Sequence, residues 1–142
     1  MKYRYFVLVG LCFVHFGCEP SAKQKAEKLQ EEVLAAHDSA MAQMENVFNQ
    51  KKSLTFLRDS IGVKDTTAQR LVNQGITDLT QADAGMMEWM HQFQVPDKDK
   101  PEEAIHYLET EKVKIREVQK DMKESLETAA KLQQQYKNQN EK

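Results

Sequence analysis

The residues with the most distinctive chemistry are methionines and histidines gathered in two short segments. His37 and Met41 are four residues apart, as are Met87 and His91, so each pair would share one helical face. Thioether and imidazole groups together suit a soft ion such as Cu(I). The spacing therefore raises the hypothesis of a copper site, with the candidate ligands His37, Met41, Met44, Asp83, Met87, Met90 and His91.

Core packing is the alternative interpretation of the same residues, and it is the preferred one. Methionine fills irregular gaps between helices, and Met44 and Met90 fall on the apolar stripes of predicted helices. For His37 the alternative is a polar residue at the edge of the core, paired with Asp38 or Asp83. Copper binding is therefore the second hypothesis, and no other cofactor is expected.

Catalytic motifs do not stand out in this sequence. It contains no glycine-rich phosphate loop, no Gly-x-Ser-x-Gly and no His-Glu-x-x-His, which are the arrangements that phosphate-binding loops, serine hydrolases and zinc proteases require. We therefore expect a protein that is not an enzyme.

Three helices would position the methionines and histidines. Apolar residues alternate at spacings of four and three, which is the helical period, and predict helices at about 21–61, 66–94 and 101–137. Ser21 with Gln24 and Thr66 with Gln69 have the form of capping boxes, and Pro101 suits a first helical turn. Residues 138–142 are polar and are expected to fray. Short loops between long helices favour an all-α, elongated, up-down-up antiparallel three-helix bundle.

Two details of these helices carry further expectations. Gly75 and Gly85 lie inside the second helix, where glycine is unfavourable; Gly75 therefore indicates either a local break or a close backbone approach, and Gly85 an approach by another helix. Charges of both signs alternate from Glu111 to Glu124 on the third helix, which is typical of a solvent-facing surface.

The first residues have the pattern of a secretion signal. Lys2 and Arg4 precede an apolar stretch from Phe6 to Phe16, which is shorter than the ~20 residues that a spanning helix needs. Gly17 before Cys18 is similar to a bacterial lipobox. We therefore expect a cleaved leader at 1–17, a lipidated Cys18 with a short tether at 18–20, and a folded domain from 21 to 137.

Other readings of this leader stay open. An ordinary signal peptide with an incidental cysteine is the alternative to lipidation. Cys12 is a poorer lipidation candidate because the bulky Leu11 precedes it. Several acyl chains on Cys18 would give stable membrane attachment, so the membrane is the first expected partner.

The overall charge limits the other partners. The formal net charge is −2 with 20 Lys and Arg against 22 Asp and Glu, and no sustained basic run is present, so no nucleic-acid partner is expected. A protein partner could bind the helix faces, while the oligomeric state is left undetermined.

The second methionine segment also supports a resemblance to a known group. The chain resembles small uncharacterised lipoproteins of Bacteroidota, some labelled "viral A-type inclusion protein", over about residues 29–130. The matching segments are His37-Asp38-x-x-Met41-x-x-Met44 and Ala82-Asp83-x-x-Met86-Met87-x-Trp89-Met90-x-x-Phe93. The resemblance implies a Gram-negative envelope and an acylated Cys18, and supplies no activity. The expectation is a lipid-anchored envelope protein, at the outer rather than the inner membrane, that works through surface interactions.

Overall fold

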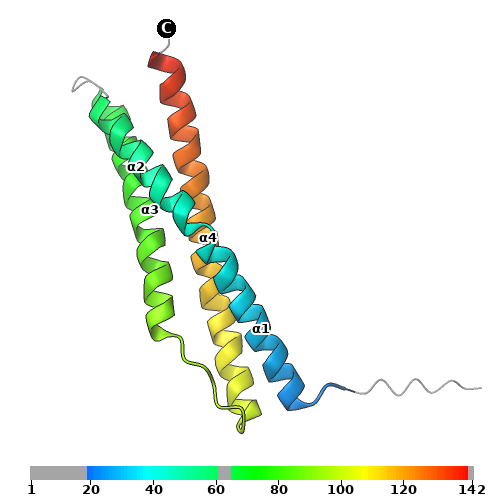
Figure 1. Cartoon of the computed structure of the whole chain (residues 1–142). Coiled ribbons are helices and arrows are strands. Elements are labelled where there is room, and N and C mark those ends of the chain that lie inside the picture. Colours follow the sequence, from blue (N-terminus) through cyan, green and yellow to red (C-terminus); the bar gives the residue numbers. More distant parts are fainter. Residues whose placement is uncertain (1–18, 61–64, 141–142) are drawn as a thin grey trace, which may run out of the picture.

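The computed structural model describes residues 19–60 and 65–140, and this part of the chain contains four helices and no strand. The helices are α1 (Ala22–Met41), α2 (Met44–Ser60), α3 (Thr66–Gln92) and α4 (Pro101–Asn140) (Figure 1). The prediction of an all-α protein is confirmed. The predicted signal sequence, Cys18 and most of the predicted turn after Ser60 lie outside the described residues.

Local capping explains where these helices begin. Ser21 and Gln24 form the predicted capping box at the start of α1. The predicted cap of α3 is wrong by one residue, because the Asp65 side chain, not that of Thr66, accepts a hydrogen bond from the Ala68 N–H at 2.8 Å. Aspartate is among the strongest capping residues, and its carboxylate here lies at the positive end of the helix dipole.

The expectation of one continuous helix over 21–61 is wrong. Ala42 and Gln43 separate α1 from α2, and the Gln43 N–H donates to the Ala40 carbonyl at 2.9 Å, which is the tighter i to i−3 pattern of a 3₁₀ turn. Seven residues of a straight α-helix fall ~20° short of two full turns, so side chains seven residues apart drift gradually around the helix. The tighter turn supplies extra rotation, so that Val47 continues the buried line of Val33 and Ala40.

The other helix ends lie close to the predicted positions. α3 ends at Gln92, two residues before the predicted end, and Phe93 caps it. α4 begins at Pro101 as predicted, but it continues to Asn140, so residues 138–140 are helical rather than frayed.

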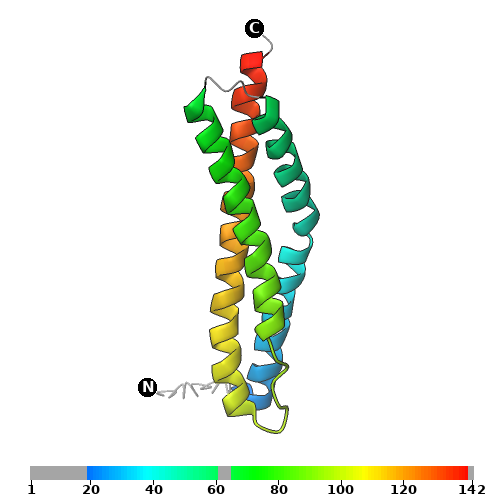
Figure 2. The ribbon, with the colours of Figure 1, turned by 90° about the vertical axis from the view of Figure 1, so that its left-hand side faces the viewer.

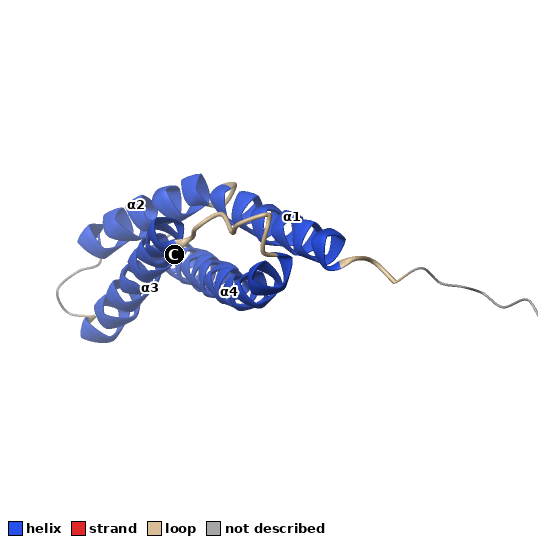
Figure 3. Cartoon of the chain, turned by 90° about the horizontal axis from the view of Figure 1, so that it is seen from below, coloured by secondary structure: helices blue, strands red, loops and turns tan. Residues whose placement is uncertain are grey.

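α4 is the central element of the molecule. It packs against α1, α2 and α3, and α2 also packs against α3, whereas α1 packs chiefly on α4. Figures 1 and 2 show an elongated shape in which α1 and α2 lie end to end and α4 runs along the whole length. In the view from below, α4 lies between α1 and α3 (Figure 3).

The core follows the predicted apolar stripes closely. Its members come from all four helices and are mostly aliphatic, with one tryptophan and one tyrosine at its ends: Val33, Ala40, Val47, Leu54, Ala68, Val72, Leu79, Ala82, Met86, Trp89, Leu108, Ile115, Met122, Ala129, Leu132 and Tyr136. Because the core is one narrow line of side chains, the remaining sides of each helix face outward and are available for contact with other molecules.

The two glycines of α3 behave differently. α3 continues through Gly75 without a break, and a Cβ there would lie 2.9 Å from Leu132 Cδ1 and 3.0 Å from Leu54 Cδ1. Close packing is therefore the reason for glycine at this position. At Gly85 no atom lies within 4 Å of the added Cβ, so the expectation of a helix approaching there is wrong.

Candidate functional site

The structure separates the predicted metal ligands into different environments. Met44 and Met90 are partly buried and pack against the core, as the packing interpretation predicts. Asp83 accepts a hydrogen bond from Lys51 Nζ at 3.5 Å, so this carboxylate is already paired with a cation.

Three of the predicted ligands face solvent. Met41 and Met87 expose 39% and 44% of their surface, and His91 is also exposed. Single exposed apolar side chains are normal on protein surfaces, so the exposure of Met41 and Met87 shows only that these two thioethers do not pack in the core.

His37 of α1 lies at the edge of the core and reaches toward α3. Its Nδ1 is 2.9 Å from the Asp38 carboxylate, which is one of the two pairings expected from the sequence. Its ring centroid is 5.8 Å from that of Trp89 on α3. The imidazole therefore bridges the otherwise sparse junction between α1 and α3.

Copper binding stays a prediction. Within 19–60 and 65–140, no group of three or more His, Cys, Asp or Glu side chains is arranged to hold a metal ion. A copper site would thus have to be built mainly from thioethers, of which Met44 and Met90 already contribute to the core.

An aromatic row extends from His37 across α3 to α4. Trp89 stacks on Phe93 with centroids 4.8 Å apart, and Phe93 lies 6.1 Å from Tyr107. The Tyr107 hydroxyl accepts a hydrogen bond from the Gln94 N–H at 2.8 Å. The row therefore anchors the start of the loop between α3 and α4.

Glu111 is a buried polar residue that sequence reasoning missed, as is Ser125. Glu111 has only 3% of its surface exposed, so the expectation that it faces solvent is wrong. Lys114 Nζ donates to Glu111 Oε1 at 2.8 Å, and this hydrogen bond raises the pKa of Lys114. The available signal was its position three residues after Leu108 and four before Ile115, on the apolar stripe of α4.

Two buried polar atoms lack hydrogen-bond partners in the described part of the chain. They are Glu111 Oε2 and Trp89 Nε1. Phe93 faces Tyr107. Trp89 lies one helical turn before Phe93 on α3, and Glu111 lies one turn after Tyr107 on α4. Trp89 and Glu111 therefore lie at a similar level. Such atoms are costly to bury unsatisfied, so this level is the least well satisfied part of the core.

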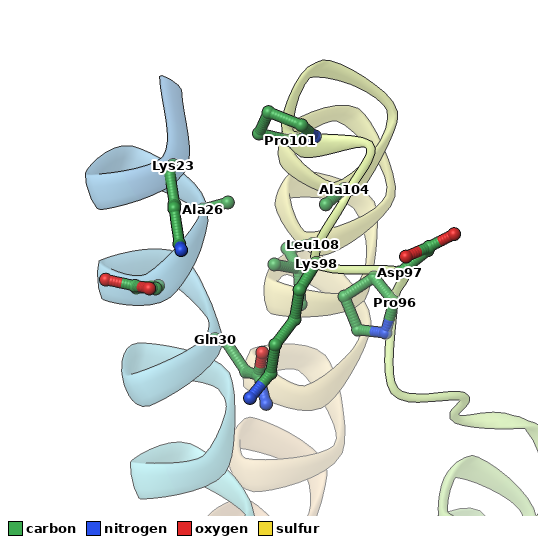
Figure 4. A pocket seen from close by; sticks show the side chains of 10 residues that line it. Lys23, Ala26, Gln30, Pro96, Asp97, Lys98, Pro101, Ala104 and Leu108 are labelled. Carbon is green, nitrogen blue, oxygen red and sulfur yellow. The ribbon is translucent and has the colours of Figure 1, made fainter. Parts of the chain in front are cut away.

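The hollows on the surface are open or small. A groove of about 840 Å³ lies beside the junction of α1 and α2 and is lined partly by Arg116, Lys120 and Lys123 of α4. A second hollow lies between the first turns of α1, the loop before α4 and the start of α4 (Figure 4). It has a volume of about 30 Å³, which is room for only one or two water molecules.

None of the described helices has both the length and the apolar composition needed to span a membrane. No protein-family model matches the chain, and comparison with curated proteins and with solved structures gives no match either. The function must therefore be argued from the residues themselves.

Proposed function

We propose that the chain is a lipid-anchored protein of the bacterial cell envelope that acts as a non-enzymatic helical interaction module. In this proposal Cys18 carries the acyl chains, the outer membrane holds the protein, and the helices form an up-down-up three-helix bundle. The bundle presents its side faces to a protein partner.

The observation that carries the anchoring part is the short distance in sequence between Cys18 and the fold. Only residues 19–21 separate this cysteine from the first residue of α1, Ala22. Fully extended, three residues span ~10 Å, so an acylated Cys18 would hold the capped start of α1 next to the membrane surface.

Surface exposure supports the interaction part. Large apolar side chains are exposed on α1, α2 and α3, among them Met41, Phe48 and Met87. Scattered single residues of this kind are normal on a monomer, but a row of them on one side suggests a docking face.

Metabolic labelling tests the lipid anchor. The full chain is expressed in a Gram-negative host that is fed an alkynyl fatty acid, and acylation is detected on a gel after coupling to a fluorophore. We expect the wild-type chain to be labelled and Cys18→Ser to lose the label completely, because the thiol is the acceptor for the acyl chain.

Cys12→Ser is the matched control, since it removes the other cysteine of the leader. It should keep the full label. Labelling of the Cys18→Ser variant, or a processed wild-type chain that carries no label, would contradict lipid anchoring and favour an ordinary signal peptide.

A further inference from the structure

Three exposed apolar residues follow one line along α1 and α2. Leu34, Met41 and Phe48 are seven residues apart, and they expose 39%, 39% and 61% of their surface. Each directly follows a residue of the buried line, which consists here of Val33, Ala40 and Val47. They therefore form a second apolar stripe beside the core stripe.

The contacts of neighbouring residues show that this stripe borders α3. His37, between Leu34 and Met41, contacts Trp89 of α3, and Lys51 pairs with Asp83 of α3. The opposite flank turns toward α4, where Glu32 pairs with Lys112.

α3 contributes to the same side of the molecule. Met87 comes four residues after Asp83, one helical turn along the flank that carries the ion pair to Lys51, and it is 44% exposed. We call Leu34, Met41, Phe48 and Met87 the methionine face. Met44 lies one turn from Met41, and Met90 lies one turn from Met87. Both are partly buried, so further methionine side chains lie between the methionine face and the core.

The dimensions and chemistry of this face suit a helix. Leu34 and Phe48 are 14 residues apart in sequence, which corresponds to ~21 Å or about four helical turns. Methionine side chains are flexible and polarizable and adapt to varied apolar partners. An amphipathic helix that presents apolar residues every three or four positions is the recognition mode that fits such a surface.

The charges around the two exposed methionines indicate which charge the polar side of a bound helix should carry. Asp38 and Glu45 lie three residues before and four after Met41, and Glu88 follows Met87; all three are exposed. No Lys or Arg lies within seven residues of Met41 or of Met87 in the sequence, and Lys51, on the same flank, is paired with Asp83. The Asp38 carboxylate also contacts Nδ1 of His37. The rim near Met41 and Met87 is therefore acidic, although Lys52 lies one turn beyond Phe48.

We propose that the methionine face docks a basic amphipathic helix of a partner protein, with the apolar side of that helix on Met41 and Met87 and its Lys or Arg residues toward Asp38, Glu45 and Glu88. Opposite charges across such a rim favour association and orientation. A second copy of this chain would bring like acidic charges together around Met41. The inference rests on the proposed role as an interaction module, but it does not depend on lipidation.

Titration with a designed peptide tests this proposal. The probe is an 18-residue amphipathic helix of Leu and Lys without tryptophan, and the matched probe replaces every Lys with Glu. The protein is the full chain carrying Cys18→Ser, so that no acyl chain competes. Trp89 is the single tryptophan and contacts His37 beside the face, so its fluorescence reports binding locally, alongside calorimetry.

Paired surface variants identify the site. Met41→Ser/Met87→Ser alters the face, and Phe56→Ser/Val113→Ser removes two exposed apolar residues elsewhere, on α2 and α4. All four residues are exposed, so both variants should keep the helical circular dichroism of the parent. We expect one-to-one binding of the Lys peptide that weakens at least tenfold in the first variant and less than twofold in the second.

Two further measurements distinguish a basic partner helix from other occupants of the face: binding of the Glu peptide and self-association of the chain. The Glu peptide should bind at least tenfold more weakly than the Lys peptide. Equal binding of both peptides, or equal binding by both variants, would overturn the proposal. So would dimerisation of the chain that Met41→Ser/Met87→Ser abolishes, because the occupant would then be a second copy. None of these outcomes affects labelling at Cys18, so lipid anchoring is judged separately.

Discussion

At the scale of single residues, α3 shows how the same residue type can serve opposite purposes. Gly75 is buried where Leu54 and Leu132 converge, and an added methyl group would lie within 3.0 Å of both side chains. Gly85 has open space at the corresponding position. Glycine costs a helix interior about 1 kcal/mol relative to alanine, so only at Gly75 does packing explain that cost.

Alanine substitutions at the two glycines should therefore differ in sign. Gly85→Ala should raise the free energy of unfolding by about 0.5–1 kcal/mol through helix propensity. Gly75→Ala gains the same propensity, but overpacking typically costs about 1–3 kcal/mol, so its stability should fall at least ~1 kcal/mol below that of Gly85→Ala. Chemical denaturation followed by circular dichroism measures both. Equal stabilisation by the two substitutions would show that the leucines move aside freely.

At the scale of helices, polar contacts supplement the apolar seam between α1 and α4. Lys112 Nζ donates to Glu32, and Gln119 Nε2 donates to the Ala36 carbonyl at 2.9 Å. Further along α4, Gln133 hydrogen-bonds to Gln50 of α2. These contacts specify the relative height of the helices, which a line of similar aliphatic residues specifies weakly.

The contact between Glu32 and Lys112 should make this pairing dependent on pH. The hydrogen bond from Lys112 lowers the pKa of Glu32, and the nearby charge of Lys112 acts in the same direction. Since the unfolded chain then binds the proton more readily, the stabilisation is present above the unfolded pKa of about 4.3 and is lost as the pH falls through the lower folded value.

Glu32→Gln tests this dependence by removing the ionisable group. The stability difference between the wild-type protein and this variant should be present at pH 7 and should shrink as the pH falls below ~4, because the wild-type carboxylate then becomes protonated. Denaturant titrations across this pH range measure the difference. Lys112→Gln should show the same trend, and a difference that stays constant with pH would contradict the assignment.

At the scale of the whole molecule, burial is uneven along the rod. Residues 22–32 of α1 contain no buried side chain, whereas α4 has buried residues from Ala104 to Tyr136. Local opening is easiest where few side chains are buried. The start of α1, which the proposed anchor holds next to the membrane, is therefore expected to be the least stable helical segment.

Hydrogen–deuterium exchange followed by mass spectrometry measures this gradient. Amides of residues 22–32 should exchange at least tenfold faster than those of residues 108–132 in α4, where the helix packs against all the others. Equal protection of the two segments would contradict the expected gradient and indicate that the molecule opens only as one unit.

Much of the architecture was predictable from local patterns. The spacing of Val33, Ala40, Val47 and Leu54 specifies an apolar side regardless of what covers it, and Pro101 suits only a first helical turn. The break at Ala42 and Gln43 was not predictable, because neither residue disfavours a helix. The break arises because residues seven apart must all face the same neighbouring helices, whereas a straight α-helix would turn them gradually away.

The sequence by itself therefore determined the helices, their approximate limits and the buried side of each, because periodicity and capping act within a few residues. Tertiary structure alone decided which flank of each helix borders which neighbour. Periodicity already placed Met44 and Met90 on the buried sides of their helices, and the structure bears this out. The packing of the helices decided instead that His37 and Lys51 face α3 and that Glu32 faces α4. Residues far apart in the sequence meet only through this packing, so no local pattern specifies which of them become neighbours.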